Sequence, residues 1–370
     1  GSAIFVVLLT LVLVPGIMAK ENWDDHDRSG RYTARDLAYN YLNSCKENAI
    51  LVSNGDNDTF PLWYAQEVEG IRTDIRVCNL SYLRASWYID QMSRKAYESE
   101  PLPFSLTHDH IYRGNREVLP MIDRFGKPVD VKQVMAFVAM DDAKAKVNSP
   151  FKANELTNYI PAKQFKLSID ANEIIQKGII TKDNQSRIVP EMQWSLGQNY
   201  LYKDGLMLLD IVATNNWNRP VYWAMTVSSS KYYNLQKYFK LDGLTYQLVP
   251  VEAKQDRYYD GEVDSEVMFD NMMNKFKWGG IENGIYLDEN NIRLFSNLRS
   301  NFGRLADKLI EEGKKDSALM VLNRCLELFP ENIVPLNNTM LPVISSYYNA
   351  GAIEKATELV ENLTERMYLE

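Results

Sequence analysis

Cysteine and histidine are both scarce in this chain of 370 residues, which has three of each. Cys45, Cys78 and Cys325 lie far apart, form no Cys-x-x-Cys pair and have no histidine near them. This spacing argues against a zinc site and against a disulfide framework, and it leaves the redox compartment open.

Clusters of basic residues and the common catalytic motifs are also missing. The 41 Lys and Arg residues form no long run, and the net charge is -8. Nucleic-acid binding is therefore not expected, because it needs clustered cations. The sequence contains no Ser-His-Asp arrangement, phosphate loop or Gly-rich dinucleotide turn. No complete active site is visible in the chain.

One long apolar run is present, at residues 3–19. It carries no charge and just reaches the length needed to cross a bilayer. A secretory signal peptide would need a basic segment before it, and nothing basic precedes Ala3. We therefore expect residues 1–19 to be the end of a transmembrane helix, broken near Pro15 and Gly16. The rest of the chain would then be a soluble part tethered to the membrane.

The middle of the chain alternates between strand and helix patterns. Short apolar runs at 49–54 and 74–80 have strand character, and helical patterns follow them at 62–68 and 87–97. Strand, helix and strand with short links imply parallel pairing with a right-handed crossover.

A looser region at 101–186 reads as an insertion around one helix. Regular patterning then returns as two further helices and two further strands. The expected helices are 131–140, 206–213 and 232–243, and the expected strands are 219–225 and 244–252. We therefore expect an α/β fold, with an open and mostly parallel sheet covered by helices.

The C-terminal section predicts paired helices. Apolar residues repeat at helical spacing from Phe302 to Ile310 and again from Ala318 to Phe329. A second copy follows at an offset of 38 residues, which places Gly351 under Gly313. The repeated Gly, Ala and Pro placements resemble tetratricopeptide units. The expected domains are thus residues 1–19, 20–288 and 289–370.

Residues 53–64, SNGDNDTFPLWY, contain the first candidate site. Asp56 and Asp58 form an Asp-x-Asp that could hold a divalent cation, and the amides of the following helix could receive a phosphate. The simpler interpretation is structural, with Asp58 or Thr59 capping the helix and Pro61 in its first turn. One capping side chain is enough for a helix, however. This loop supplies more polar side chains than a cap requires, at Asn54, Asp56, Asn57 and Asp58.

A second candidate lies directly after the apolar run. His26 sits among Asp24, Asp25 and Asp27, with Arg28 and Arg31 close behind. Neighbouring residues rarely converge on a metal, but two guanidinium groups at headgroup level suit a lipid phosphate. The alternative is a solvated linker. Farther on, His108 and His110 could bind a metal only if their segment is a strand, and no third ligand is evident.

The strings at 21–45 and 48–83 resemble a bacterial family of multi-spanning membrane proteins grouped with glycosyltransferase family 117. An animal relative of that family is a protein O-mannosyltransferase. The resemblance implies a lipid-phosphate-sugar-dependent enzyme with its active site at the extracytoplasmic border. It also implies that the catalytic carboxylate lies in the membrane part, outside this chain, so the resemblance assigns no catalytic residue here.

We therefore expect the extracytoplasmic C-terminal region of a membrane glycosyltransferase, periplasmic in a bacterium. Asp24, His26, Arg28 and Arg31 would border the phosphate of a polyprenyl-phosphate sugar donor. The loop from Asn54 to Asp58 would face the same cleft or bind acceptor, and the helical repeats would bind a protein acceptor or partner. Two alternatives are a non-catalytic scaffold tethered to the membrane and a soluble nucleotide-sugar enzyme that uses a metal.

Overall fold

The computed structural model describes residues 1–112, 114–254 and 259–369. The chain divides into two compact units, which we call the terminal unit and the α/β unit. The terminal unit joins Gly1–Leu37 to Phe276–Glu370, and the α/β unit is Ala38–Lys275. This is a division by compactness, and the domains expected at 20–288 and 289–370 stay a prediction.

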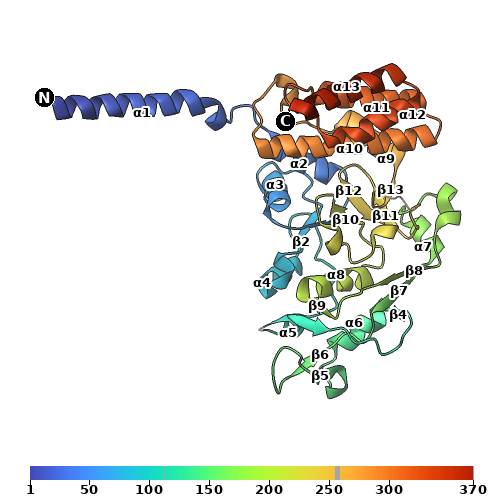
Figure 1. Ribbon diagram of the computed structural model, residues 1–370. Coiled ribbons are helices and arrows are strands. Elements are labelled where there is room, and N and C mark those ends of the chain that lie inside the picture. The colour runs from blue at the N-terminus through green and yellow to red at the C-terminus, as the bar shows by residue number, and fades with distance from the viewer. Residues whose placement is uncertain (113, 255–258, 370) are drawn as a thin grey trace. The chain divides into compact units, whose positions relative to one another are not determined.

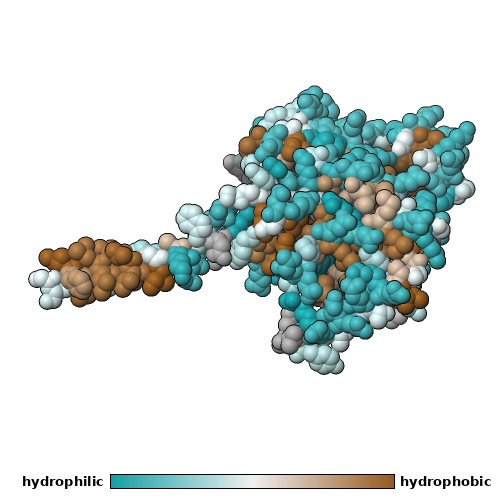
Figure 2. Space-filling view, turned by 90° about the horizontal axis from the view of Figure 1, so that it is seen from above, coloured by the Kyte–Doolittle hydropathy of each residue, from teal (hydrophilic) through white to brown (hydrophobic). Residues whose placement is uncertain are grey.

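Helix α1 (Ser2–His26) contains the apolar run. Its segment Ser2–Trp23 is long and apolar enough to cross a membrane, with a mean hydropathy of 2.5 and none of its apolar window buried. Figure 2 shows hydrophobic atoms covering the visible face of this helix. The expected break near Pro15 is wrong, because Pro15 lies inside one continuous helix. The composition of α1 fits a membrane anchor.

The main sheet of the α/β unit has the strand order β13-β11-β12-β10-β1-β2. Strand β1 pairs in parallel with both β2 and β10, as the sequence predicts, whereas β12 pairs antiparallel with β10 and β11. Strand β13 pairs in parallel with β11, so the sheet is mixed, with three parallel and two antiparallel pairings. Its strands are β1 (Ile50–Ser53), β2 (Arg76–Asn79), β10 (Val221–Ala224), β11 (Phe239–Leu241), β12 (Thr245–Leu248) and β13 (Glu262–Val263).

The antiparallel part arises at residues 232–243, where the expected helix is wrong. This segment forms a short 3-10 turn and then strand β11, which returns as β12. Asp242 and Gly243 form the connection, and Gly243 has a φ of 139°. An Asp-Gly pair between two apolar runs is a strong hairpin signal, and it overrides the helical spacing of the residues before it.

The region expected to be loose contains small sheets. Strands β3 and β9 pair antiparallel, as do β5 and β6, while β7 lies between β4 and β8. Their bounds are β3 (Val118–Pro120), β4 (Val129–Asp130), β5 (Lys146–Asn148), β6 (Leu156–Asn158), β7 (Gln164–Ser168), β8 (Glu191–Ser195) and β9 (Tyr200–Tyr202).

Helices surround the sheets of the α/β unit (Figure 1). The expected helices at 131–140 and 206–213 are confirmed as α6 and α8, and Asp130 caps α6. The α-helices are α2 (Thr33–Asn43), α3 (Asp56–Glu67), α4 (Ser86–Met92), α5 (His108–Ile111), α6 (Val131–Ala139), α7 (Ala171–Gln176), α8 (Lys203–Thr214) and α9 (Ser265–Asp270). The shorter turns are η1 (Tyr82–Arg84), η2 (Ala143–Ala145), η3 (Lys182–Arg187), η4 (Ser229–Lys231), η5 (Gln236–Tyr238) and η6 (Asn271–Lys275).

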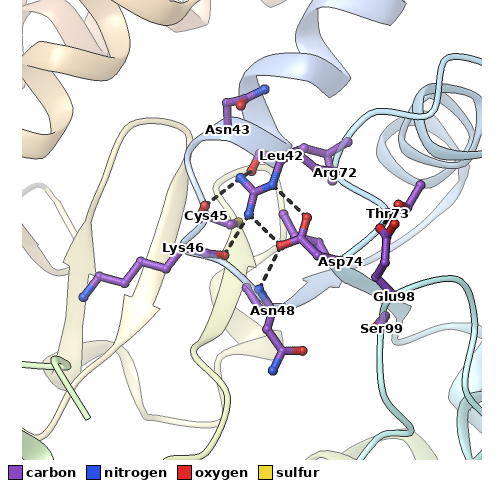
Figure 3. A network of polar contacts seen from close by, with 12 residues as sticks. Leu42, Asn43, Cys45, Lys46, Asn48, Arg72, Thr73, Asp74, Glu98 and Ser99 are labelled. Atoms are coloured by element: carbon purple, nitrogen blue, oxygen red, sulfur yellow. Dashed lines mark hydrogen bonds and ion pairs between the residues drawn. The ribbon is translucent and has the colours of Figure 1, made fainter. Parts of the chain in front are cut away.

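A guanidinium clamp joins the end of α2 to the start of β1 (Figure 3). Arg72 donates hydrogen bonds to the carbonyl oxygens of Leu42, Cys45 and Lys46 at 3.0 to 3.1 Å. It also forms a bidentate pair with Asp74 at 2.8 and 2.9 Å. Leu42 lies in the last turn of α2, and its carbonyl also accepts from the Cys45 amide at 3.2 Å. Arg72 therefore adds a second donor to this carbonyl and supplies a charged donor to the two carbonyls that follow the helix.

The C-terminal part of the terminal unit consists of paired helices. Gly313 and Gly351 both adopt left-handed φ angles, 77° and 95°, at the turns that separate the members of each pair. The expected helix faces are confirmed, since Phe302, Leu305 and Ala318 are fully buried. The elements are η7 (Ile281–Asn283), α10 (Glu289–Glu311), α11 (Lys315–Leu328), η8 (Asn338–Met340), α12 (Leu341–Ala350) and α13 (Ile353–Leu369).

Both ends of the chain contribute to the terminal unit. The Asp36 carboxylate accepts a hydrogen bond from the Gly279 amide at 3.0 Å, and the Tyr32 amide donates to the Gly279 carbonyl at 3.1 Å. A Cβ at Gly279 would lie 2.7 Å from the Thr33 Cα, and the φ of Gly279 is +69°. Only glycine fits this close approach.

Candidate functional site

The loop after β1 leads directly into α3. This helix begins at Asp56, its N-cap is Gly55 with a φ of 90°, and no side chain caps it. The capping interpretation is therefore wrong, because Asp58 and Thr59 lie inside the helix and Thr59 Oγ1 donates to the Gly55 carbonyl at 2.7 Å. Pro61 also falls beyond the first turn. The polar residues of this loop have other partners.

Asp58 points to the end of a neighbouring strand. Because β1 and β10 are parallel, the residues that follow them meet at one edge of the sheet. Thr226, just after β10, donates from Oγ1 to Asp58 Oδ2 at 2.5 Å, and the Tyr41 hydroxyl lies 3.2 Å from Thr226 Oγ1. Asp58 is only 9% exposed. The carboxylate thus belongs to a group of Asp58, Thr226 and Tyr41, in which Asp58 and Tyr41 are buried and Thr226 is exposed. We call this group the edge site.

Asn79 at the end of β2 holds the loop beside the edge site. Its side-chain amide donates to Thr59 Oγ1 at 2.9 Å and to the Gly55 carbonyl at 3.2 Å. Its Oδ1 accepts from the Ser81 amide at 2.8 Å. Nearby, Ser81 Oγ donates to Asn54 Oδ1 at 3.2 Å. Loops from β1 and β2 are therefore tied together by side-chain amides.

The surroundings of the edge site disfavour negative charge. Burial raises the pKa of Asp58, and the Thr226 hydrogen bond opposes this rise without cancelling it. Burial also raises the pKa of Tyr41, and the nearby Asp58 charge adds to that effect. A carboxyl group with a raised pKa at the end of parallel strands suits proton transfer or a hydrogen bond to a ligand hydroxyl.

The Asp58→Asn variant is expected to be at least as stable as the wild-type protein at neutral pH. Because the folded-state pKa is raised, the carboxyl binds protons more tightly in the native than in the unfolded protein. The stability of the wild-type protein therefore falls as pH rises from the unfolded-state pKa to the folded-state pKa of Asp58. The stability advantage of Asn should shrink toward acidic pH. Urea unfolding of both proteins across the acidic range measures it. An advantage for wild type that grows with pH would contradict the raised pKa.

Asp56 and Asp58 do not form a metal site by themselves. Asp56 is exposed at the first position of α3, whereas Asp58 is buried against Thr226. Within residues 1–112, 114–254 and 259–369, no group of three or more His, Cys, Asp and Glu residues could hold a metal ion. Asn57 is exposed beside Asp56, and neither contributes to the edge site.

The segment after α1 has mainly local contacts. His26 Nδ1 lies 2.9 Å from the Asn22 carbonyl, and Asp27 accepts from the Ser29 amide at 2.9 Å. Arg28 is exposed, and the Arg31 guanidinium lies 4.8 Å from the centre of the Tyr286 ring. The side chain of Asp24 is outside the described parts of the structure. A shared cleft with the Asn54 to Asp58 loop stays a prediction.

His108 and His110 lie in helix α5 and not in a strand. His108 Nδ1 pairs with Asp90 at 2.8 Å, whereas His110 Nδ1 accepts from the Thr107 amide at 3.0 Å. The two rings therefore have different partners, and the strand that a His-x-His metal site requires is not formed.

Sequence reasoning missed Thr226, Tyr41 and Asn79. Two of these could have been found, because Asn79 and Thr226 come at or just after strands that were expected to be parallel to β1. The carboxyl ends of parallel strands share an edge, so polar residues there are candidates together. Tyr41 lies in α2 and gives no such signal.

Comparison with known proteins gives one finding. The family model described as TMEM260-associated domain 2 matches residues 34–267, which is more than half of the chain. No curated protein and no solved structure matches the chain. The matched residues include the edge site, the main sheet and its helices. This chain therefore belongs to the TMEM260-associated domain 2 family.

Proposed function

We propose that this chain is the extracytoplasmic C-terminal region of a multi-spanning membrane glycosyltransferase. In this proposal the enzyme is protein O-mannosyltransferase-like, related to glycosyltransferase family 117, and takes its sugar from a polyprenyl phosphate. The observation that carries the proposal is the family match at residues 34–267 directly after an apolar helix, Ser2–Trp23. The catalytic carboxylate would lie in the membrane part of the enzyme, outside this chain.

The exposed segment after α1 would border the donor phosphate. If α1 crosses the bilayer, the residues that follow it lie at headgroup level. Arg28 is exposed there, and a guanidinium group matches phosphate oxygens in geometry and charge. The lipid phosphate of the donor lies at the same level. A contact between Arg28 and this phosphate is therefore favoured over a contact with residues farther from the membrane.

The Arg28→Ala substitution in a full-length parent enzyme should reduce sugar transfer from a polyprenyl-phosphate donor by about tenfold, mainly through a higher KM for the donor. Transfer of labelled mannose to endogenous protein in membranes measures the effect. Arg94→Ala is the matched control, since Arg94 is exposed and lies in the α/β unit. Equal donor KM values for Arg28→Ala and wild type would remove Arg28 from the donor site.

A membrane-tethered scaffold is the second candidate function. The observation that favours it is the set of paired helices α10 to α13, whose Gly and Ala placements resemble tetratricopeptide units. Such helices would bind a protein partner or acceptor and assemble a cell-envelope complex. This function predicts a stoichiometric protein partner and no response to polyprenyl-phosphate sugars, so donor binding to the full-length parent separates the two candidates.

A further inference from the structure

We infer that the outer face of α3, with η1 and the start of α4, binds a neutral oligosaccharide. Four side chains define this aromatic strip: Phe60, Trp63, Tyr82 and Trp87. Phe60 is 48% exposed and Trp87 is 60% exposed, while Trp63 and Tyr82 are half-buried. Exposed aromatic side chains that lie together mark a binding surface more often than isolated ones do. The inference goes beyond the proposed function, because it adds a glycan-binding surface to the proposed protein O-mannosyltransferase-like enzyme.

The four rings form a continuous row. Phe60 and Trp63 are three residues apart on one helix face, with ring centres 5.8 Å apart. Trp63 and Tyr82 follow at 5.9 Å with only 11° between their planes, and Tyr82 and Trp87 at 6.1 Å. These steps are comparable with the repeat of an extended hexose chain. We expect successive sugar units to lie along this row.

A buried tyrosine holds two rings of the row in place. Tyr88 is buried, and its ring packs 5.6 Å from both Tyr82 and Trp87. Its hydroxyl accepts a hydrogen bond from the Asn79 amide at 2.9 Å, and Asn79 Oδ1 in turn accepts from the Tyr82 amide at 3.3 Å. The rings thus lose little freedom when a ligand binds, which favours affinity.

Polar side chains lie at the α3 end of the strip. Asp56 and Asn57 are exposed one turn before Phe60, and α3 contains no Lys or Arg. Carboxylate and amide oxygens accept hydrogen bonds from sugar hydroxyls, while the C–H face of a pyranose lies on an aromatic ring, whose face is electron-rich. The Asp56 carboxylate opposes phosphates and other anions at this end of the strip.

A quaternary ammonium ion fits the strip less well than a sugar. A quaternary ammonium ion is held by rings that surround it, whereas Trp63 and Tyr82 are nearly parallel and lie in a row. Aromatic residues are also enriched where proteins bind one another, so the binding test includes a protein occupant among its outcomes. Of the large hydrophobic residues exposed between residues 54 and 112, all but Val68 are aromatic. Aromatic rings with polar side chains at one end favour a sugar.

The test is direct binding by the full chain, purified in a detergent without a sugar headgroup. Neutral hexasaccharides of β-linked glucose, β-linked N-acetylglucosamine and α-linked mannose are titrated by calorimetry. At least one should bind saturably, and Trp87→Ala should weaken it by about tenfold, whereas Trp87→Phe should retain most of the affinity. Phe125→Ala is the control, because Phe125 is 53% exposed and lies outside the strip.

Several results would overturn the inference. These are the absence of saturable binding by any of the three sugars, or sugar affinity that is unchanged by Trp87→Ala. Binding of choline or a second copy of the chain in place of sugars, lost in Trp87→Ala, would reassign the strip. A different result would count against the proposed function alone. In that case Arg28→Ala would leave the donor KM of the full-length parent unchanged, while the strip would still bind sugar.

Discussion

The Arg72→Met substitution should lower the free energy of unfolding of the α/β unit by about 3 kcal/mol. The side chain is 22% exposed and satisfies three backbone carbonyls as well as the carboxylate of Asp74. Methionine retains the apolar stem but leaves these oxygens without their donor. Urea unfolding followed by far-UV circular dichroism measures the change, and Arg94→Met, at an exposed position, should shift stability by less than about 0.5 kcal/mol.

Acid gives a second test of the same clamp. Burial opposes ionisation of Asp74, but the hydrogen bonds from Arg72 and from the Asn48 amide outweigh it, so the pKa of Asp74 is lowered. A lowered folded-state pKa stabilises the protein above the usual Asp range, and this stabilisation is lost as pH falls through the folded-state value. The difference in free energy of unfolding between wild type and Arg72→Met should therefore become smaller in acid. A gap that stays constant would mean that Asp74 does not depend on Arg72.

The Phe302→Ala substitution should lower the stability of the terminal unit by about 4 kcal/mol. Phe302 is fully buried in α10, and its ring centre lies 5.6 Å from that of Trp278 and 5.9 Å from that of Phe329. Removing the ring leaves a cavity where helix α10 meets the aromatic residues of its own unit. Thermal and urea unfolding of the full chain, followed by the loss of helical signal, measure this change.

Met320 provides the matched control for this prediction. It lies in α11 of the same unit and is 56% exposed. Met320→Ala should change stability by less than about 0.5 kcal/mol, because most of this side chain is already exposed to solvent. Phe302→Leu should be intermediate, since leucine fills part of the cavity. A loss below about 1 kcal/mol for Phe302→Ala would show that the helices of this unit collapse to fill the space.

The fold was predictable where one local signal prevailed. The apolar runs of β1, β2 and β10 and the helical spacing of α8 and α10 each indicated the correct element, because buried faces fix those patterns. The segment 232–243 shows the limit. Its apolar spacing favours a helix, but the Asp242-Gly243 turn and pairing with β12 place Phe239 and Leu241 in a strand.

The candidate site was predictable only in part. The Asn54 to Asp58 loop was chosen for its density of polar groups, and Asp58 is indeed buried with a hydrogen bond to Thr226. Its partner Thr226 is 168 positions away in the sequence, and only the parallel pairing of β1 with β10 brings the two together. The sequence shows which strands are apolar, but their order in a sheet depends on long-range packing. The contribution of Tyr41 could not be predicted from the sequence for the same reason.

The terminal unit is assembled from both ends of the chain, and this has a consequence for synthesis. Residues 38–275 leave the ribosome as a continuous stretch and can fold as they emerge. Thr33 and Asp36 are made early, yet their partner Gly279 is translated more than 240 positions later. The contacts of Thr33 and Asp36 with Gly279 therefore form only after most of the chain has been made, so chaperone binding and premature proteolysis should concentrate at the stretch after α1.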